Sequence, residues 1–141
     1  MSHISHSSMG ADMADINNDG YLDIAVTHVG GYNFHLWTSC EGNSNNYVKL
    51  KLQGTNSNRD AYGARVEVYT PDSYQITQKV SHNAYVAQNS DILTIGIGEE
   101  TVIDSIRITW PFEGSVTVLT ASEIDLNRFK QIHTCNISTD C

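Results

Sequence analysis

An acidic loop near the start of the chain carries the clearest chemical pattern in the sequence. The stretch DINNDGYLD supplies side-chain oxygens at alternating positions and places Gly20 in the turn. This spacing suits a hard divalent cation, and its several carboxylates favour Ca²⁺ because Mg²⁺ prefers a stiffer and wetter site. The sequence therefore predicts a calcium site. The predicted ligands are the side chains of Asp15, Asn17, Asp19 and Asp23 and the backbone carbonyl of Tyr21.

The loop is not an EF-hand. An EF-hand loop ends in a bidentate acid at its twelfth position, where this chain has Val26. The stretch LDIAVTH that follows is also strand-like, whereas an EF-hand continues into a helix. The remaining alternative is a polar turn without metal, because Asp and Asn favour turns on their own account.

Composition excludes several classes of function. The chain has 141 residues and a formal net charge of −8, so it lacks the basic surface that nucleic acids or anionic membranes require. No apolar run is long enough to insert into a bilayer. The N-terminus MSHISHSSMG lacks the apolar stretch of a signal peptide. We therefore expect either a cytoplasmic chain or a fragment of a longer protein with an export signal upstream.

Apolar and polar residues alternate in four later stretches, YVKLKLQ, ARVEVYT, DSIRITW and SVTVLT. A period of two predicts strands with one buried face, and breakers separate the runs. We expect an all-β fold with an antiparallel sandwich- or barrel-like domain. Thr120 and Glu123 form a capping-box pattern that favours a short helix, whereas RFKQIH after them is typical of a last strand. The expected inward residues are Val48, Leu50, Leu52, Val66, Val68, Ile106, Ile108 and Trp110, opposite Lys49, Lys51, Gln53, Arg65, Glu67, Tyr69, Arg107 and Thr109.

The stretch SNRDAYGAR is rich in hydrogen-bonding side chains. One interpretation is a ligand-recognition loop for sugar or peptide, built from Asn58, Arg59, Asp60 and Arg65. The alternative is structural: an ion pair of Asp60 with Arg59 or Arg65 fixes a long loop whose polar groups need internal partners. The structural interpretation is favoured.

Three aromatic residues, Trp37, Tyr62 and Trp110, are candidates for a platform on which a sugar ring stacks. Residues of this kind more often pack in a core or at its rim. Trp110 ends an alternating strand and has Pro111 behind it, so its position predicts a core residue.

Other chemistry is weakly indicated. The histidines His3, His6, His28, His35, His82 and His133 are scattered singly, so no zinc site is predicted. No nucleophile elbow or phosphate-binding loop occurs, and the chain is not expected to be an enzyme. A cluster of Asp60, His82 and Glu113 would reverse that expectation. A disulfide between Cys135 and Cys141 can close a small terminal loop in an oxidising compartment, and Cys40 would then be a free thiol. Three free thiols are the alternative.

Two segments resemble known families. The segment SMGADMADINNDGYLDIAV resembles an FG-GAP or VCBS-type repeat, the calcium-loop motif of β-propeller blades in integrin-like and bacterial secreted proteins. The segment NYVKLKLQGTNSNRDAYGARVEVYT resembles the start of the ASPIC/UnbV domain, and GIG at 96–98 and ITWP at 108–111 are similar to its later signatures. The chain departs from that pattern in SHNAY and WPFEG. The matching early positions are Leu52, Gly54, Ser57, Asn58, Arg59 and Gly63 to Val66.

The resemblance implies a partial, propeller-blade-like repeat over 1–42, an ASPIC/UnbV-like β domain over 43–134 and a tail over 135–141. It also implies an extracellular, periplasmic or cell-surface protein without established catalytic activity. The predicted function is a non-enzymatic, calcium-associated binding or structural module with Ca²⁺ as a structural staple and a protein or glycan ligand. The alternative is a carbohydrate-binding module that uses Trp37, Tyr62 and the Asn58–Asp60 loop.

A partial blade without neighbouring blades leaves apolar side chains uncovered. Bare sheet edges and faces of this kind are association sites. We therefore expect a homodimer through the N-terminal segment, with a monomer whose segment folds back on its own sandwich as the alternative. The residues expected to lack cover are Met9, Met13, Leu22, Ile24, Val26, Phe34, Leu36 and Trp37.

Overall fold

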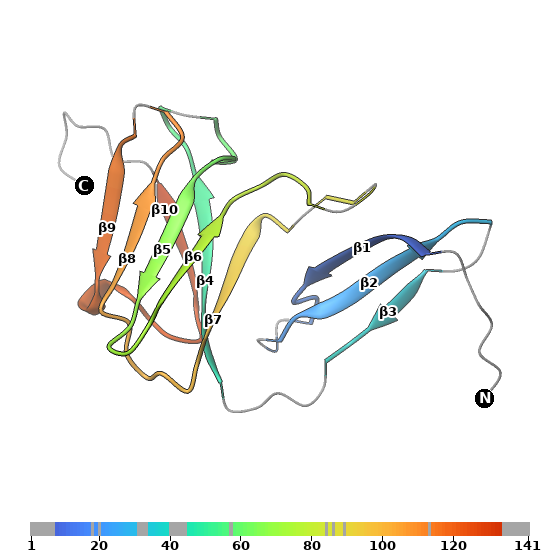
Figure 1. The fold of residues 1–141 in the computed structure, drawn as a ribbon, viewed down its shortest axis with the longest axis horizontal. Coiled ribbons are helices and arrows are strands. Elements are labelled where there is room, and N and C mark those ends of the chain that lie inside the picture. Colours follow the sequence, from blue (N-terminus) through green and yellow to red (C-terminus); the bar gives the residue numbers. More distant parts are fainter. Residues whose placement is uncertain are drawn as a thin grey trace. The chain divides into compact units, whose positions relative to one another are not determined.

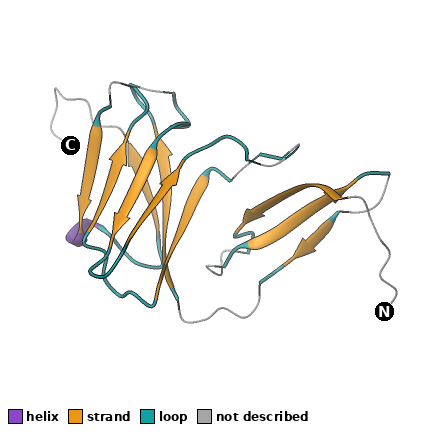
Figure 2. Cartoon of the chain, in the orientation of Figure 1, coloured by secondary structure: helices purple, strands orange, loops and turns teal. Residues whose placement is uncertain are grey.

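The regular secondary structure of the described residues is almost entirely β-strand, as predicted (Figures 1 and 2). A computed structural model describes residues 8–17, 19, 21–30, 34–39, 45–56, 58–83, 85, 87–88, 90–112 and 114–133. The chain divides into two compact units. One comprises Met1–Gly42 with Ser81–Ser90, and the other comprises Asn43–Val80 with Asp91–Cys141. No closed barrel forms in the described part of the chain, so the sandwich alternative of the prediction is the correct one.

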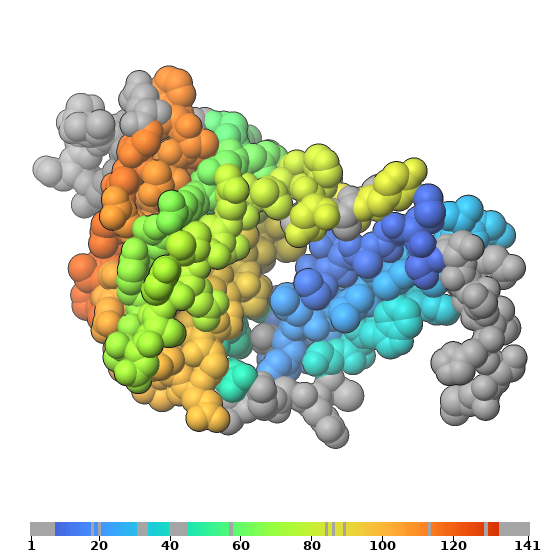
Figure 3. Space-filling model, viewed as in Figure 1, coloured from blue at the N-terminus to red at the C-terminus, as the bar shows by residue number. Residues whose placement is uncertain are grey.

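The first unit contains a three-stranded antiparallel sheet of β1 (Ser8–Ala14), β2 (Asp23–His28) and β3 (His35–Trp37). Its strands lie as adjacent blue to cyan bands in Figure 3. Met13 pairs with Ile24, which pairs with Trp37, so three apolar side chains form a row across the sheet. All three are exposed, as are Met9, Leu22, Phe34 and Leu36, whereas Val26 is half-buried.

The second unit is a sandwich of two sheets. One sheet has the antiparallel order β6–β5–β8–β9, and the other has the order β10–β4–β7, in which β10 runs parallel to β4. Their bounds are β4 Asn46–Gln53, β5 Arg65–Tyr69, β6 Tyr74–Gln78, β7 Ile92–Gly98, β8 Ser105–Thr109, β9 Val116–Thr120 and β10 Phe129–His133.

The core lies between these two sheets, because alternating side chains of both face inward. Every residue predicted to point inward is buried, including Trp110, which is 2 % exposed. The indole N–H of Trp110 donates to Thr117 Oγ1 over 2.9 Å, so the buried polar atom is satisfied. The expectation that Trp110 belongs to the core is confirmed.

Two residues predicted to face water are buried instead. Lys49 on β4 packs its ammonium over the Tyr47 ring, 5.3 Å from the centroid. Glu67 on β5 lies between two arginines of the same face, 2.7 Å from Arg65 Nη2 and 3.7 Å from Arg107 Nε. Long neighbouring side chains cover both residues, a contribution that alternation alone does not reveal.

The capping-box pattern and the last strand both occur, one after the other. A single 3₁₀ turn, η1 (Ala121–Glu123), follows β9, and the Glu123 carboxylate accepts the backbone N–H of Thr120 over 2.8 Å. The Thr120 backbone and hydroxyl bonds lower the pKa of Glu123. Of the stretch RFKQIH, residues Phe129–His133 then form β10 beside β4. No described helix is long and apolar enough to cross a membrane.

Candidate functional site

The Asp15–Asp23 loop connects β1 to β2 and gathers oxygens around the backbone of Asp19. The Asp19 N–H donates to Asp15 Oδ1 over 3.1 Å and to Asn17 Oδ1 over 3.0 Å. Asp19 itself accepts the Tyr21 N–H through Oδ1 and the Asn17 amide through Oδ2. Asp15 and Asn17 thus accept the same backbone N–H of Asp19, and Asp19 accepts that of Tyr21, an arrangement that a polar turn also adopts.

Asp23 has a different place. It is fully buried, and its two carboxylate oxygens accept the N–H groups of Ile16 and Ser39, each over 2.9 Å. Asp23 therefore joins the loop to the chain beyond β3. Each carboxylate oxygen has two lone pairs, so these bonds leave acceptor capacity for a cation.

The predicted calcium ligands fit the ion by donor type. All are oxygens, three of them are carboxylates, and hard cations take oxygen ligands. In the described residues, no three His, Cys, Asp or Glu side chains converge as a metal-binding group. The loop thus supplies oxygen ligands of the kind that Ca²⁺ takes, but its described carboxylates do not converge on one point. Gly20 lies outside the described residues.

The loop after β4 is held by its own backbone and by Asn58. The Asn58 side chain accepts the Tyr62 N–H over 2.7 Å and donates to the Tyr62 carbonyl over 2.8 Å. Gly54 N–H donates to the Arg59 carbonyl, and Ala61 N–H donates to the Asn58 carbonyl. Asn58, predicted as a ligand residue, is therefore engaged in fixing the loop.

The favoured ion pair of this loop does not form. Arg65 pairs with Glu67 on its own strand and not with Asp60. Within the described residues, neither the Arg59 guanidinium nor the Asp60 carboxylate has an ion pair. The prediction was wrong: Arg65 pairs with Glu67, and the hydrogen bonds of Asn58 order the loop in place of the expected ion pair.

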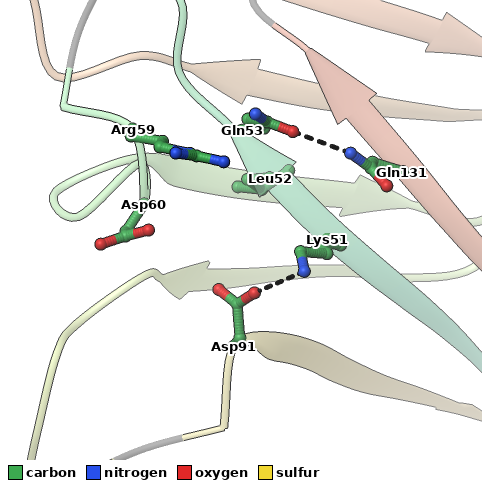
Figure 4. A pocket seen from close by; sticks show the side chains of 7 residues that line it. All are labelled: Lys51, Leu52, Gln53, Arg59, Asp60, Asp91 and Gln131. Carbon is green, nitrogen blue, oxygen red and sulfur yellow. Dashed lines mark hydrogen bonds and ion pairs between the residues drawn. The ribbon is translucent and has the colours of Figure 1, made fainter.

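Arg59 and Asp60 instead line a polar pocket of about 450 Å³ within the second unit (Figure 4). The loop contributes these two residues, and β4 contributes Lys51, Leu52 and Gln53. In Figure 4 the Arg59 side chain extends toward Gln53 above the pocket. Gln131 of β10 donates to Gln53 Oε1 over 2.8 Å. Asp91, directly before β7, completes the lining.

Asp91 pairs with two lysines, of which Lys51 also lines this pocket. Lys51 Nζ lies 2.9 Å from Asp91 Oδ2, and the buried Lys79 Nζ lies 3.2 Å from Asp91 Oδ1. Lys79 also donates to the Asp91 carbonyl. Partial burial raises the pKa of Asp91, but the hydrogen bonds and charges of the two lysines outweigh it and lower the pKa overall. Asp91 is therefore ionised at neutral pH.

Sequence reasoning missed Lys51, Gln53, Asp91 and Gln131. Alternation along β4 places Lys51 and Gln53 on the same face. Gln131 joins them only because β10 pairs in parallel with β4, with Gln131 opposite Lys51. That pairing spans about eighty residues of sequence, and no local pattern indicates it.

Two histidines that look isolated in sequence meet across strands. His28 Nε2 lies 2.9 Å from His35 Nδ1, and His28 Nδ1 lies 3.1 Å from Ser8 Oγ. The rings of His35 and Trp37 are also in edge contact. The expectation that the histidines are scattered singly is wrong for this pair, because strands β2 and β3 are antiparallel neighbours.

Trp110 cannot join the predicted aromatic platform, because it is buried in the core. Trp37 and Tyr62 belong to different compact units. Asp60 and His82 are likewise in different units. Glu113, Cys40, Cys135 and Cys141 lie outside the described residues.

Comparison with known proteins identifies the second unit. The sequence profile of the family described as ASPIC and UnbV matches residues 54–133, more than half of the chain. A search of curated proteins gave no match. The matched range contains the Arg59 loop, β5 to β10 and four of the seven pocket residues: Arg59, Asp60, Asp91 and Gln131. The family is a β-rich domain of secreted or cell-surface proteins. The sandwich fold and the matched range agree with the family resemblance of the chain's sequence motifs. The chain belongs to the ASPIC and UnbV family.

Proposed function

We propose that this chain is a non-enzymatic, calcium-associated binding module, part of a secreted or cell-surface protein. In this proposal its N-terminal unit is a partial FG-GAP or VCBS-type propeller repeat. The observation that carries the calcium role is the Asp15–Asp23 loop. The side-chain oxygens of Asp15 and Asn17 converge on the Asp19 N–H, and the buried Asp23 carboxylate accepts the N–H groups of Ile16 and Ser39.

Ca²⁺ would be held by the side chains of Asp15, Asn17, Asp19 and Asp23 with the Tyr21 carbonyl. The ion would supply positive charge to a loop that carries three carboxylates in nine residues. Because the Asp23 carboxylate also accepts the N–H groups of Ile16 and Ser39, an ion held by that carboxylate would reinforce the connections of the N-terminal sheet. The role is therefore structural.

The pocket chemistry supports binding rather than catalysis. A general acid at neutral pH needs a raised carboxyl pKa. The pKa of Asp91 is lowered by Lys51 and Lys79, so this carboxylate is unsuited to that role. The polar lining also supports the second candidate, a carbohydrate-binding module, at the Arg59–Asp60 part of the loop rather than at the aromatic residues.

The calcium role is tested by thermal unfolding of chelator-treated protein. We expect a dissociation constant on the order of 10⁻⁴ to 10⁻³ M, as in other extracellular modules. At ten times that concentration the folded state should gain about 1.4 kcal/mol, because the ion binds only that state. Asp19→Ala should abolish the gain.

Asp12→Ala is the matched control, since Asp12 belongs to the same unit and lies on β1 outside the loop. It should respond to Ca²⁺ as the wild type does. An equal concentration of Mg²⁺ controls for ionic strength. If wild type and Asp19→Ala respond identically to Ca²⁺, the loop is only a polar turn.

A further inference from the structure

The pocket beside the Arg59 loop gathers charged side chains of both signs. Its lining contributes Lys51, Arg59, Asp60 and Asp91, two cations and two carboxylates. The buried Lys79 does not line the pocket but contacts Asp91. Both oxygens of Asp91 are engaged by the two lysines. The Arg59 guanidinium is the cation that lacks an ion pair among the described residues.

We propose that this pocket binds a small hydroxylated carboxylate of the sugar-acid class. The proposal rests on the binding role proposed above and names its ligand. A guanidinium presents parallel N–H donors that match a carboxylate in a bidentate pair. One ligand carboxylate would pair with Arg59, which has no ion pair among the described residues, while Lys51 lies in the same lining.

The other polar side chains of the pocket can form hydrogen bonds with the hydroxyl groups of such a ligand. Gln53 accepts from Gln131 through Oε1, and its own amide nitrogen has no partner among the described residues. The Asp60 carboxylate accepts only, so it would receive ligand O–H donors. Gln53 and Asp60 thus provide a donor and an acceptor in the same pocket as Arg59.

The lining also argues against other ligand classes. It contains no aromatic ring, so a neutral sugar would lack a stacking surface and should bind weakly. A phosphate dianion would meet the like charges of Asp60 and Asp91. A divalent cation would compete with the two lysines already bound to Asp91. A monoanion with several hydroxyls meets less repulsion from Asp60 and Asp91 than a dianion does, and unlike a neutral sugar it can form an ion pair with Arg59.

The test is titration of the full chain with D-glucuronate, D-glucose and sodium acetate, followed by amide chemical shifts in two-dimensional NMR. D-glucuronate should shift amides of the Arg59 loop and of β4, and bind at least tenfold more tightly than either of the other two. Arg59→Gln should weaken D-glucuronate binding about ten- to a hundredfold, the range for one charge-assisted hydrogen-bonding group. The Arg59 side chain has no structural partner among the described residues, so this variant should fold.

Arg107→Gln is the matched control, because Arg107 is a half-exposed arginine of β8 outside the pocket. It should bind D-glucuronate as the wild type does. The proposal is overturned if D-glucuronate does not bind, if Arg59→Gln binds it unchanged, or if glucose or acetate binds equally well. Calcium-dependent unfolding of the same samples separates the two proposals, since a calcium response without D-glucuronate binding refutes only the ligand.

Discussion

The ion pair between Lys79 and Asp91 should contribute to the free energy of unfolding of the second unit. These residues lie on either side of the Ser81–Ser90 segment, which groups with the other unit. The Lys79 side chain is 1 % exposed, whereas the Asp91 side chain is 48 % exposed. Asp91→Ala would leave a buried ammonium without its carboxylate, and the energetic consequence differs from that of removing the lysine itself.

Removing one partner of a buried pair costs about 3–5 kcal/mol. The cost here should be lower, about 2–3 kcal/mol, because water screens the half-exposed Asp91 and Lys79 keeps the Asp91 carbonyl as an acceptor. Lys79→Met should change stability by less than about 1 kcal/mol, since an apolar side chain of similar length replaces the buried charge. Lys51→Met should also cost at most about 1 kcal/mol, because that pair is exposed.

Urea unfolding of the three variants and of Asp91→Ala combined with Lys79→Met measures these differences. The double variant should recover most of the loss of Asp91→Ala, because it removes the stranded charge. The reasoning is refuted if Asp91→Ala costs no more than Lys51→Met, or if the two changes in the double variant simply add.

The pH dependence of the same variants gives an independent check. The lysines lower the folded-state pKa of Asp91 below its unfolded value. The stabilisation by its carboxylate is therefore fully present above an ordinary aspartate pKa of about 4 and is lost as pH falls through the lower, folded-state value. The stability difference between wild type and Asp91→Ala should be constant near neutral pH and should narrow in acid. A difference that widened below pH ~4 would contradict the assigned sign.

Two further predictions concern the Arg59 loop and self-association. Gly63→Ala should destabilise by about 1–3 kcal/mol, because Gly63 has φ +94° and an added Cβ would lie 3.1 Å from Pro111 Cβ. Gly96→Ala, with no atom within 4 Å of the added Cβ, should stay near the wild type in the same denaturation assay. The exposed row of Met13, Ile24 and Trp37 should make the chain a homodimer in solution, which light scattering would detect as twice the monomer mass. Ile24→Asp should dissociate the dimer. A wild-type mass of 15.6 kDa at high micromolar concentration would exclude the dimer.

Local patterns predicted the strands well because burial on one face imposes a period of two. The inward residues of β4, β5 and β8 are the expected ones. The pairing of β10 with β4 was beyond such reasoning, since no turn joins these strands and the register is set by core packing around Ile132. Gln131 therefore enters the pocket through a long-range contact, and neither its residue type nor its neighbours reveal it.

The charged residues of the loop were harder to assign, since a sequence shows which ion pairs are possible and not which ones form. Asp60 had two arginines within reach along the chain, and Arg65 instead pairs across the face of β5 with Glu67. The hydrogen bonds of the loop count against the structural role that we expected for its charged residues. Asn58 and the backbone hold the loop, so Arg59 and Asp60 are unnecessary for that task.

Charged side chains that a loop does not need for its own order are informative when they line a cavity. An exposed arginine that merely extends into water would carry no argument, because most surface arginines do so. Arg59 instead shares a pocket with Lys51, Gln53 and Asp91, whose positions are set by strands β4 and β7. Arg59 on a loop thus lies beside polar side chains that the β-sheet holds in place. Binding residues on loops that a rigid scaffold positions are common in β-sandwich proteins. The Asp91 experiment also bears on function, because Lys51, which pairs with Asp91, lines the same pocket as Arg59.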